Sequence, residues 1–145
     1  MNILVSACLL CVKCRYDGRD NKSDILLKLI SKGYNLIPIC PEQLGGLPTP
    51  RKPAEIINGR VINIDNEDVT ENFIKGADEV LKISKLYDVK LAVLKERSPS
   101  CGFGEIYDGT FNKVLINGNG ICANLLANNN IKIIGECKIK EYFEL

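Results

Sequence analysis

Short apolar segments alternate with helical patterns along the whole chain, and this alternation constrains the fold more than any other feature. Each segment has four or five residues and is bounded by turn residues or a helical pattern, as is typical of buried strands. The segments are Asn2–Ser6, Asn35–Ile39, Lys90–Leu94 and Ile131–Ile134. Strands that alternate with helices form a mainly parallel sheet with helices on its faces. The sequence therefore predicts a three-layer α/β fold, Rossmann-like or flavodoxin-like, with residues 1–145 as a single domain.

Three helices and one hairpin are predicted between these strands. Ser23 is a suitable N-cap for a helix over Asp24–Lys32, and Asp68 for a longer helix over 69–87. A third helix is expected over Ile121–Asn128. Asn58-Gly59 separates two short β-rich segments, which is a strong hairpin signal.

The rest of the chain is predicted to be loops. Residues 40–53 contain several prolines and glycines, and long loops of this kind in a small domain usually carry function. Residues 95–111 are expected to form a second polar loop. Asn117–Gly120, which matches no phosphate-binding motif, is expected to be a helix-capping turn.

Composition excludes several classes of protein. The chain has a net charge of +1, so nothing in its charge marks a nucleic-acid or membrane-surface partner, and a large RNA is disfavoured. No apolar run approaches the ~20 residues of a transmembrane helix, and we expect a cytoplasmic protein. In a reducing compartment, the seven cysteines are expected to be free thiols or metal ligands rather than disulfides.

The chain contains no histidine, which narrows its possible chemistry. It cannot build a Ser-His-Asp triad, a Cys-His pair or a histidine-ligated zinc site. Cys8, Cys40 and Cys101 follow predicted strands, and the ligands of open α/β sheets lie at the carboxyl ends of the strands. We therefore expect these three thiols to share one edge of the sheet, where they could bind zinc, copper(I) or an iron–sulfur cluster.

A second set of cysteines competes with this one. Cys8, Cys11 and Cys14 have the C-x-x-C-x-x-C spacing of the first three ligands in bacterial ferredoxins, but no fourth cysteine followed by proline continues the run. Cys122 and Cys137 are predicted to be small buried apolar residues instead.

Several motifs spread over the chain resemble the family once called DUF523, which is associated with thiouracil desulfurases. The segments that carry the resemblance are VSACLL, RYDG, CPEQLGGLPTPR followed by PAEI, DVT-x-x-F-x-x-GA, LKERSPSCG, IYDGTF and GNGICANLL. The resemblance covers nearly the whole chain, and CPE-x-x-GGLPTPR and SPSCG are its most specific parts.

The resemblance implies a [4Fe–4S] cluster held by three cysteines, with one iron left open. By motif, these ligands correspond to Cys8, Cys40 and Cys101. Cys11 stands where glycine is expected and Cys14 at a variable position, so either could supply a fourth ligand and close the open iron. The implied reaction converts a thiolated pyrimidine, such as 2-thiouracil, to the oxo-base and hydrogen sulfide without a redox change.

Other residues of the motifs are candidates for proton transfer and for substrate binding. Glu42 is the preferred general acid or base, and Ser98 and Ser100 could orient water or substrate, with Ser98 preferred. Arg51 could neutralise cluster charge. The candidates for contacts to the pyrimidine are Arg15, Tyr16, Asp17, Tyr107, Asp108 and Thr110.

Two other functions are consistent with the thiol pattern. The chain could be a zinc protein that uses Cys8, Cys11, Cys14 and one further cysteine. It could also be a cofactor-free α/β binding module whose thiols bind no metal.

Overall fold

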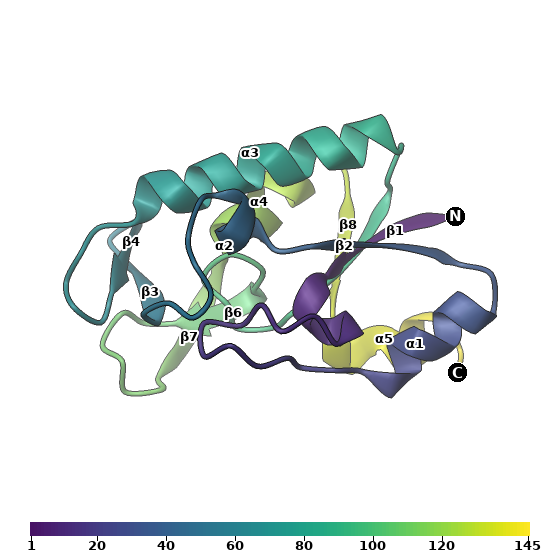
Figure 1. Cartoon of the computed structure of the whole chain (residues 1–145), viewed down its shortest axis with the longest axis horizontal. Helices are drawn as coiled ribbons and strands as arrows, with labels where there is room; N and C mark the ends of the chain where they lie inside the picture. Colours follow the sequence, from purple (N-terminus) through teal and green to yellow (C-terminus); the bar gives the residue numbers. More distant parts are fainter.

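A four-stranded parallel sheet lies at the centre of the computed structural model, which describes all residues from 1 to 145. Its strands are β1 (Asn2–Ser6), β2 (Asn35–Ile39), β5 (Leu91–Leu94) and β8 (Lys132–Gly135). They are arranged in the order β2-β1-β5-β8, and every neighbouring pair is parallel (Figure 1). The predicted α/β class is confirmed.

Pro38 lies within β2, opposite Val5 of β1. A proline has no backbone N–H to donate, so it is tolerated in a sheet mainly on edge strands. β2 pairs only with β1 and is therefore an edge strand, which explains how the sheet accommodates Pro38.

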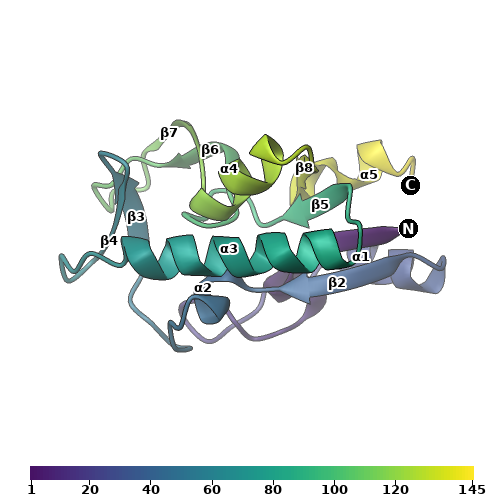
Figure 2. The same cartoon turned by 90° about the horizontal axis from the view of Figure 1, so that it is seen from above.

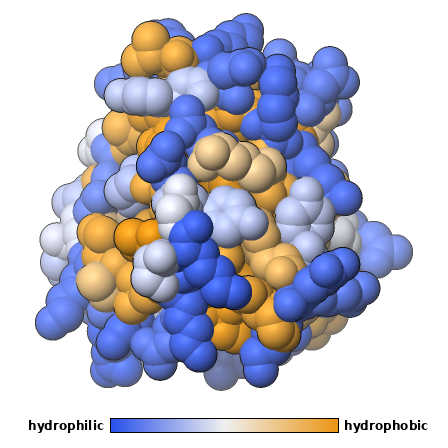
Figure 3. Space-filling view, turned by 90° about the vertical axis from the view of Figure 1, so that its right-hand side faces the viewer, coloured by the Kyte–Doolittle hydropathy of each residue, from blue (hydrophilic) through white to orange (hydrophobic).

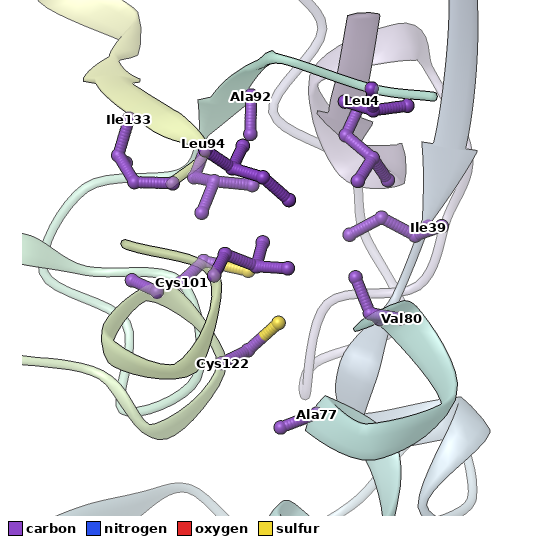
Figure 4. Packing of buried hydrophobic residues seen from close by; sticks show 13 residues of the cluster. Leu4, Ile39, Ala77, Val80, Ala92, Leu94, Cys101, Cys122 and Ile133 are labelled. Atoms are coloured by element: carbon purple, nitrogen blue, oxygen red, sulfur yellow. The ribbon is translucent and has the colours of Figure 1, made fainter. Parts of the chain in front are cut away.

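Helices cover both faces of the sheet, giving three layers (Figures 1 and 2). On one face, α3 (Thr70–Leu86) and α4 (Ile121–Asn128) pack on Leu4, Ala92 and Leu94 of the strands (Figure 4). On the other face, α1 (Asp24–Ser31) and α5 (Ile139–Tyr142) pack on Ile3, Val5 and Val93. Successive strand residues point to opposite faces, so burial on both faces requires the continuous apolar runs seen in the sequence.

The predicted helix starts are confirmed with one shift of boundary. Ser23 accepts a hydrogen bond from the Leu26 N–H at the start of α1 (3.4 Å). α3 begins at Thr70, and Asp68 Oδ1 accepts a hydrogen bond from the Thr70 N–H (2.9 Å) although Val69 is the N-cap residue.

Two hairpins extend from the sheet at the end of the molecule opposite the chain termini (Figure 1). The predicted hairpin pairs β3 (Ala54–Ile57) with β4 (Arg60–Asn63) across Asn58-Gly59, both with positive φ, as a two-residue hairpin turn requires. The second pairs β6 (Phe103–Tyr107) with β7 (Leu115–Asn119). Glu55 Oε1 accepts hydrogen bonds from the Gly109 and Phe111 N–H groups (3.0 and 3.1 Å), so β3 is tied to the loop of the second hairpin.

The second hairpin contradicts two predictions in part. Residues 95–111 are not wholly a loop, because they contain β6. Residues 117–119 belong to β7, and only Gly120 caps α4 as predicted. Phe103, Gly104 and Glu105 are exposed, so the segment has neither a continuous apolar run nor a regular alternation to indicate a strand.

Short helical segments were also missed. Residues 40–53 contain α2 (Pro41–Leu44), and 3₁₀ turns follow β1 (η1, Ala7–Leu10) and β8 (η2, Glu136–Lys138). Cys122 packs in the core beside α3, as predicted (Figure 4), but Cys137 is exposed because η2 lies on the surface.

The end of the molecule that carries both termini has a mixed surface, on which apolar groups show between hydrophilic ones (Figure 3). No helix in the structure combines the length and the apolar character needed to cross a lipid bilayer.

Candidate metal centre

A cavity of about 440 Å³ lies where β1, β2 and β5 end. Four cysteines line it, contributed by three chain segments far apart in the sequence: Cys8, Cys14, Cys40 and Cys101. All seven cysteines of the chain are free thiols. The parallel pairing of the three strands is what brings these segments to one edge.

Cys8 lies in η1, directly after β1, and is held by Asn21. The Asn21 N–H donates a hydrogen bond to the Cys8 carbonyl (2.8 Å), and Asn21 Nδ2 donates one to Cys8 Sγ (3.4 Å). Arg15 Nη1 in turn donates to Asn21 Oδ1 (2.9 Å). The sulfur of Cys8 therefore has a fixed direction within the cavity wall.

Cys40 is the N-cap residue of α2, and close backbone packing fixes this short helix on α3. A Cβ atom on Gly76 of α3 would overlap the Pro41 carbonyl, and one on Gly45 would overlap the Asn72 carbonyl. Only glycine at both positions allows the two backbones to meet. Since Cys40 and Glu42 flank Pro41, this contact sets the position of both side chains.

Cys101 is held by a loop that docks on the first turn of α4. Ser98 Oγ accepts hydrogen bonds from the Ser100 and Cys101 N–H groups (both 3.1 Å). The Ser100 carbonyl accepts from the Cys122 N–H of α4 (2.9 Å). A Cβ on Gly120 would lie 2.5 Å from the Ser100 carbonyl carbon, so this docking also requires glycine. Ser100 Oγ lies 3.7 Å from the Cys101 sulfur.

Cys14 is the fourth thiol of the cavity, and its side chain is buried, with 3% of its surface exposed. Its thiol is close enough to Cys8 and Cys40 to affect the pKa values of both. Arg51 Nη2 donates to the Cys14 carbonyl (2.8 Å). Cys11, in contrast, is exposed with a left-handed φ of 69° and does not line the cavity. Of the three cysteines in the C-x-x-C-x-x-C run, Cys8 and Cys14 therefore line the cavity and Cys11 does not.

The four thiols of the cavity differ in their pKa values. Hydrogen bonding to Cys14 lowers the pKa of Cys8 to about 7 and that of Cys40 to about 6. The same bonds raise the pKa of Cys14. Burial raises the pKa of Cys101 to about 12. Cys8 and Cys40 are therefore ready to act as thiolate ligands, since the thiolate is the form that binds metals.

The donor set fits an iron–sulfur cluster better than a single metal ion. No three Cys, Asp or Glu side chains are close enough together to bind one ion, so the structure has no preformed zinc site. Sulfur donors spread over the cavity are compatible with a larger, multi-iron group. Lys95 and Arg51, which also line the cavity, provide positive charge near Cys8 and Cys40 respectively.

A chain of polar side chains connects Glu42 to the Cys101 loop. Ser100 Oγ donates a hydrogen bond to Glu42 Oε2 (3.0 Å), and Ser98 Oγ lies 2.9 Å from Ser100 Oγ. Arg51 Nε forms an ion pair with Glu42 Oε1 (3.2 Å), in which the arginine side chain is only 5% exposed. The carboxylate of Glu42 is thus oriented from both sides, with one oxygen on a cation and the other on a hydroxyl.

The predicted substrate-binding residues divide into two groups. Arg15, Tyr16 and Tyr107 line the cavity. Asp17, Asp108 and Thr110 do not line it. Asp17 forms an ion pair with Arg15 (3.0 Å), and Asp108 Oδ1 accepts hydrogen bonds from the N–H and hydroxyl of Thr110 within a turn.

Several cavity residues were missed from the sequence. They are Ser6, Cys14 as a member of the main thiol group, Asn21, Lys95, Glu96, Arg97 and Lys113. Lys95 directly follows β5, so its position at a strand end was a usable signal. No sequence pattern indicated Asn21, because its contact with Cys8 depends on how the loop after η1 folds back.

A parallel α/β fold with a thiol-lined cavity at the carboxyl edge of its sheet defines the class of this protein as a candidate sulfur-ligated metalloprotein. The family model described as 2-thiouracil desulfurase matches residues 3–138, and the chain belongs to this family. The resemblance found in the motifs is therefore confirmed.

Individual relatives match over nearly the full chain. The "Uncharacterized protein YbbK" of Bacillus subtilis (strain 168) is 40% identical over 149 residues, which cover 96% of this chain and 98% of the relative. A solved structure described as "[4Fe-4S]-dependent thiouracil desulfidase TudS (DUF523Vcz)" is similar with a TM-score of 0.91 and 41% identity. That match covers 97% of this chain and 93% of the solved one.

The contact between α2 and α3 predicts a substitution that disturbs the site from outside the cavity. Gly76→Ala should destabilise the protein by about 1–3 kcal/mol, because the added methyl group overlaps the Pro41 carbonyl. Urea unfolding measures this loss. Lys75→Ala, at an exposed position of the same helix, is the control and should change the unfolding free energy by less than about 0.5 kcal/mol. A Gly76→Ala protein as stable as this control would contradict the packing argument.

The hydrogen bond from Cys14 predicts the pH dependence of thiol reactivity in the metal-free protein. Alkylation of Cys40 by iodoacetamide should be half-maximal near pH 6, because the thiolate is the reactive form and the pKa of Cys40 is lowered to about 6. Cys14→Ala removes the hydrogen-bond donor, so the midpoint should move to higher pH. Peptide mass spectrometry over a pH series measures both profiles, and identical midpoints would contradict the assigned cause.

Proposed function

We propose that this protein is a [4Fe–4S]-dependent desulfurase that converts a small thiolated pyrimidine, of the 2-thiouracil type, to the oxo-base and hydrogen sulfide. The observation that supports this most directly is the meeting of Cys8, Cys40 and Cys101 with the Glu42–Ser100 pair in one cavity. Membership in the 2-thiouracil desulfurase family and the similarity to the solved thiouracil desulfidase support the same reaction.

Cys8, Cys40 and Cys101 are the proposed cluster ligands, each in the segment that follows a different central strand. When bound, the cluster supplies an iron without a protein ligand, a soft Lewis acid that binds the thiocarbonyl sulfur and makes its carbon more electrophilic. The overall reaction balances as thiouracil plus water giving uracil plus hydrogen sulfide. Neither carbon nor sulfur changes its oxidation state, so no external oxidant or reductant is needed.

Glu42 is proposed to move the protons of this reaction. As a carboxylate it can accept a proton from the attacking water and later return it to the departing sulfur. Arg51 orients this carboxylate through Nε and would also stabilise negative charge in the cavity. Ser100 donates to the other carboxylate oxygen and can hold water beside it.

Ser98 and Ser100 therefore receive different proposed roles. Ser98 Oγ accepts two backbone hydrogen bonds, and since Ser100 donates to Glu42, Ser98 is left to donate to Ser100. Ser98 thus positions Ser100, and Ser100 is the hydroxyl nearer to the proton transfer. This changes the preference for Ser98 that the sequence suggested.

Tyr16, Tyr107 and Arg15 are the proposed contacts of the pyrimidine, since each lines the cavity. A tyrosine ring can stack on the flat base, and a guanidinium can donate hydrogen bonds to its oxygen. Asp17 would act on substrate through its ion pair with Arg15, and Asp108 and Thr110 would shape the loop that follows Tyr107. We also propose the cytoplasm as the site of action, because a reducing compartment keeps such thiols free.

Replacing single cysteines tests the ligand set. Cys40→Ser and Cys101→Ser should each lose the cluster, whereas Cys11→Ser should retain about four irons and about four sulfides per chain. Iron and acid-labile sulfide analysis of protein purified without oxygen measures this outcome. A wild-type protein that contains one zinc ion and no iron would support the zinc alternative. A metal-free protein with fully titratable thiols after reconstitution would support the binding module.

Replacing Glu42 separates proton transfer from cofactor binding. Glu42→Gln should keep the cluster but lower the rate of sulfide release from 2-thiouracil by roughly 10²–10⁴-fold, the usual contribution of a general acid or base. Glu105→Gln changes an exposed carboxylate of β6 and should leave the rate unaffected. Normal turnover by the Glu42→Gln protein would remove Glu42 from the mechanism.

A further inference from the structure

We propose that Cys14 is a displaceable fourth sulfur ligand that closes the cluster site until substrate arrives. This inference rests on the proposed function, because it concerns the iron that Cys8, Cys40 and Cys101 leave open. It assigns a role to a thiol that three-cysteine ligation does not use.

The location of Cys14 within the thiol group is the first observation. Its side chain is 3% exposed and lines the same cavity as the three proposed ligands, and its backbone carbonyl lies 3.8 Å from the Cys40 sulfur. A buried sulfur in the wall of this cavity is placed where it could reach a multi-iron group held by the other three. Cys11, three residues earlier, is exposed and outside the cavity, so position in the C-x-x-C-x-x-C run alone does not account for this arrangement.

The backbone of Cys14 is fixed to the catalytic side of the cavity. Its carbonyl accepts a hydrogen bond from Arg51 Nη2 (2.8 Å), and the Cys40 thiol lies 3.8 Å from the same oxygen. Its N–H donates to the Val12 carbonyl (2.8 Å). With the backbone held, a change of the Cys14 side-chain torsion between rotamers would move the sulfur within the cavity.

The chain around Cys14 differs from that around the other three ligands, and this favours a weaker and replaceable bond. Cys8, Cys40 and Cys101 lie within seven residues of a central strand end, in turns that dock on helices or on the sheet. Cys14 follows three exposed residues, 11–13, whereas the residues on both sides of Cys8, Cys40 and Cys101 are buried. A segment with few buried neighbours yields at low free-energy cost, so the exchange can use the Cys14 side chain while its hydrogen-bonded backbone stays in place.

The exchange of ligands balances without a redox step. In the resting state Cys14 would give up its S–H proton to solvent and bind the cluster as a thiolate. The substrate sulfur would displace it, and the freed thiolate would take up a proton from solvent. Substrate then competes with an internal ligand, so its apparent affinity is lowered by the fraction of sites that are closed.

The test compares the wild-type holoenzyme with Cys14→Ala and Cys14→Ser proteins, and with Cys11→Ala as a matched control from the same loop. Each is oxidised with ferricyanide, and the three-iron cluster that forms when an unprotected iron is lost is measured by electron paramagnetic resonance. The wild-type and Cys11→Ala proteins should resist this loss, whereas both Cys14 variants should lose one iron readily. The Cys14 variants should also show a lower KM for 2-thiouracil, by about tenfold if one site in ten is open in the wild type.

Each other outcome overturns the inference in an identifiable way. Equal iron loss in the wild-type and Cys14 variants, with an unchanged KM, would show that Cys14 remains a protonated hydrogen-bond donor. Complete loss of the cluster in both Cys14 variants would make Cys14 an obligatory ligand rather than a displaceable one. A wild-type protein that binds no iron would overturn the proposed function together with this inference.

Discussion

The parallel pairing of β1 with β2 on one side and β5 on the other is the constraint on which the site depends. Parallel strands all end at the same edge of a sheet, so the segments that follow them must start there. Cys8, Cys40 and Cys101 each belong to one of these segments, although more than ninety residues separate the first from the last. The sheet is held by residues such as Leu4 and Val5, which are fully buried on opposite faces, and each contributes roughly 1.5–3 kcal/mol by its burial.

Close backbone contacts then fix the exact positions of the segments that carry the site residues. Gly45 and Gly76 allow α2 to lie directly on α3, and Gly120 allows the Cys101 loop to lie on α4. In both places a backbone carbonyl, of Pro41 or of Ser100, packs against a glycine of α3 or at the start of α4. The core helices therefore serve two purposes, because they cover the sheet and also hold the segments that carry Cys40, Glu42 and Cys101.

Much of the fold follows from the sequence, because the central strands are buried on both faces and therefore apolar throughout. Asn2–Ser6 and Asn35–Ile39 were predicted with the bounds that the structure has. β6 was missed because its first residues are exposed, and α2 because its stability depends on a contact with α3 rather than on its own four residues. The local sequence pattern does not predict a strand or helix whose order depends mainly on contacts with distant residues.

The same distinction applies to the site. The positions of Cys8, Cys40 and Cys101 could be predicted from strand ends, whereas Cys11 and Cys14 are equivalent in spacing and differ only in the path of the loop. The left-handed backbone at Cys11 turns that residue outward, and Arg51 draws the Cys14 carbonyl inward. Neither effect can be predicted from the sequence, because each depends on the three-dimensional path of the loop and on its contact with Arg51.

The hydrogen bonds of Arg51 limit which residues can replace it. Its guanidinium donates through Nε to Glu42, through Nη2 to the Cys14 carbonyl, and through Nη1 to the Pro48 carbonyl and Thr49 Oγ1. This set of acceptors lies around a flat, forked group, and a lysine has only one nitrogen with which to reach them. An exchange of arginine for lysine, neutral at many surface positions, would here keep the charge and still leave partly buried acceptors without donors.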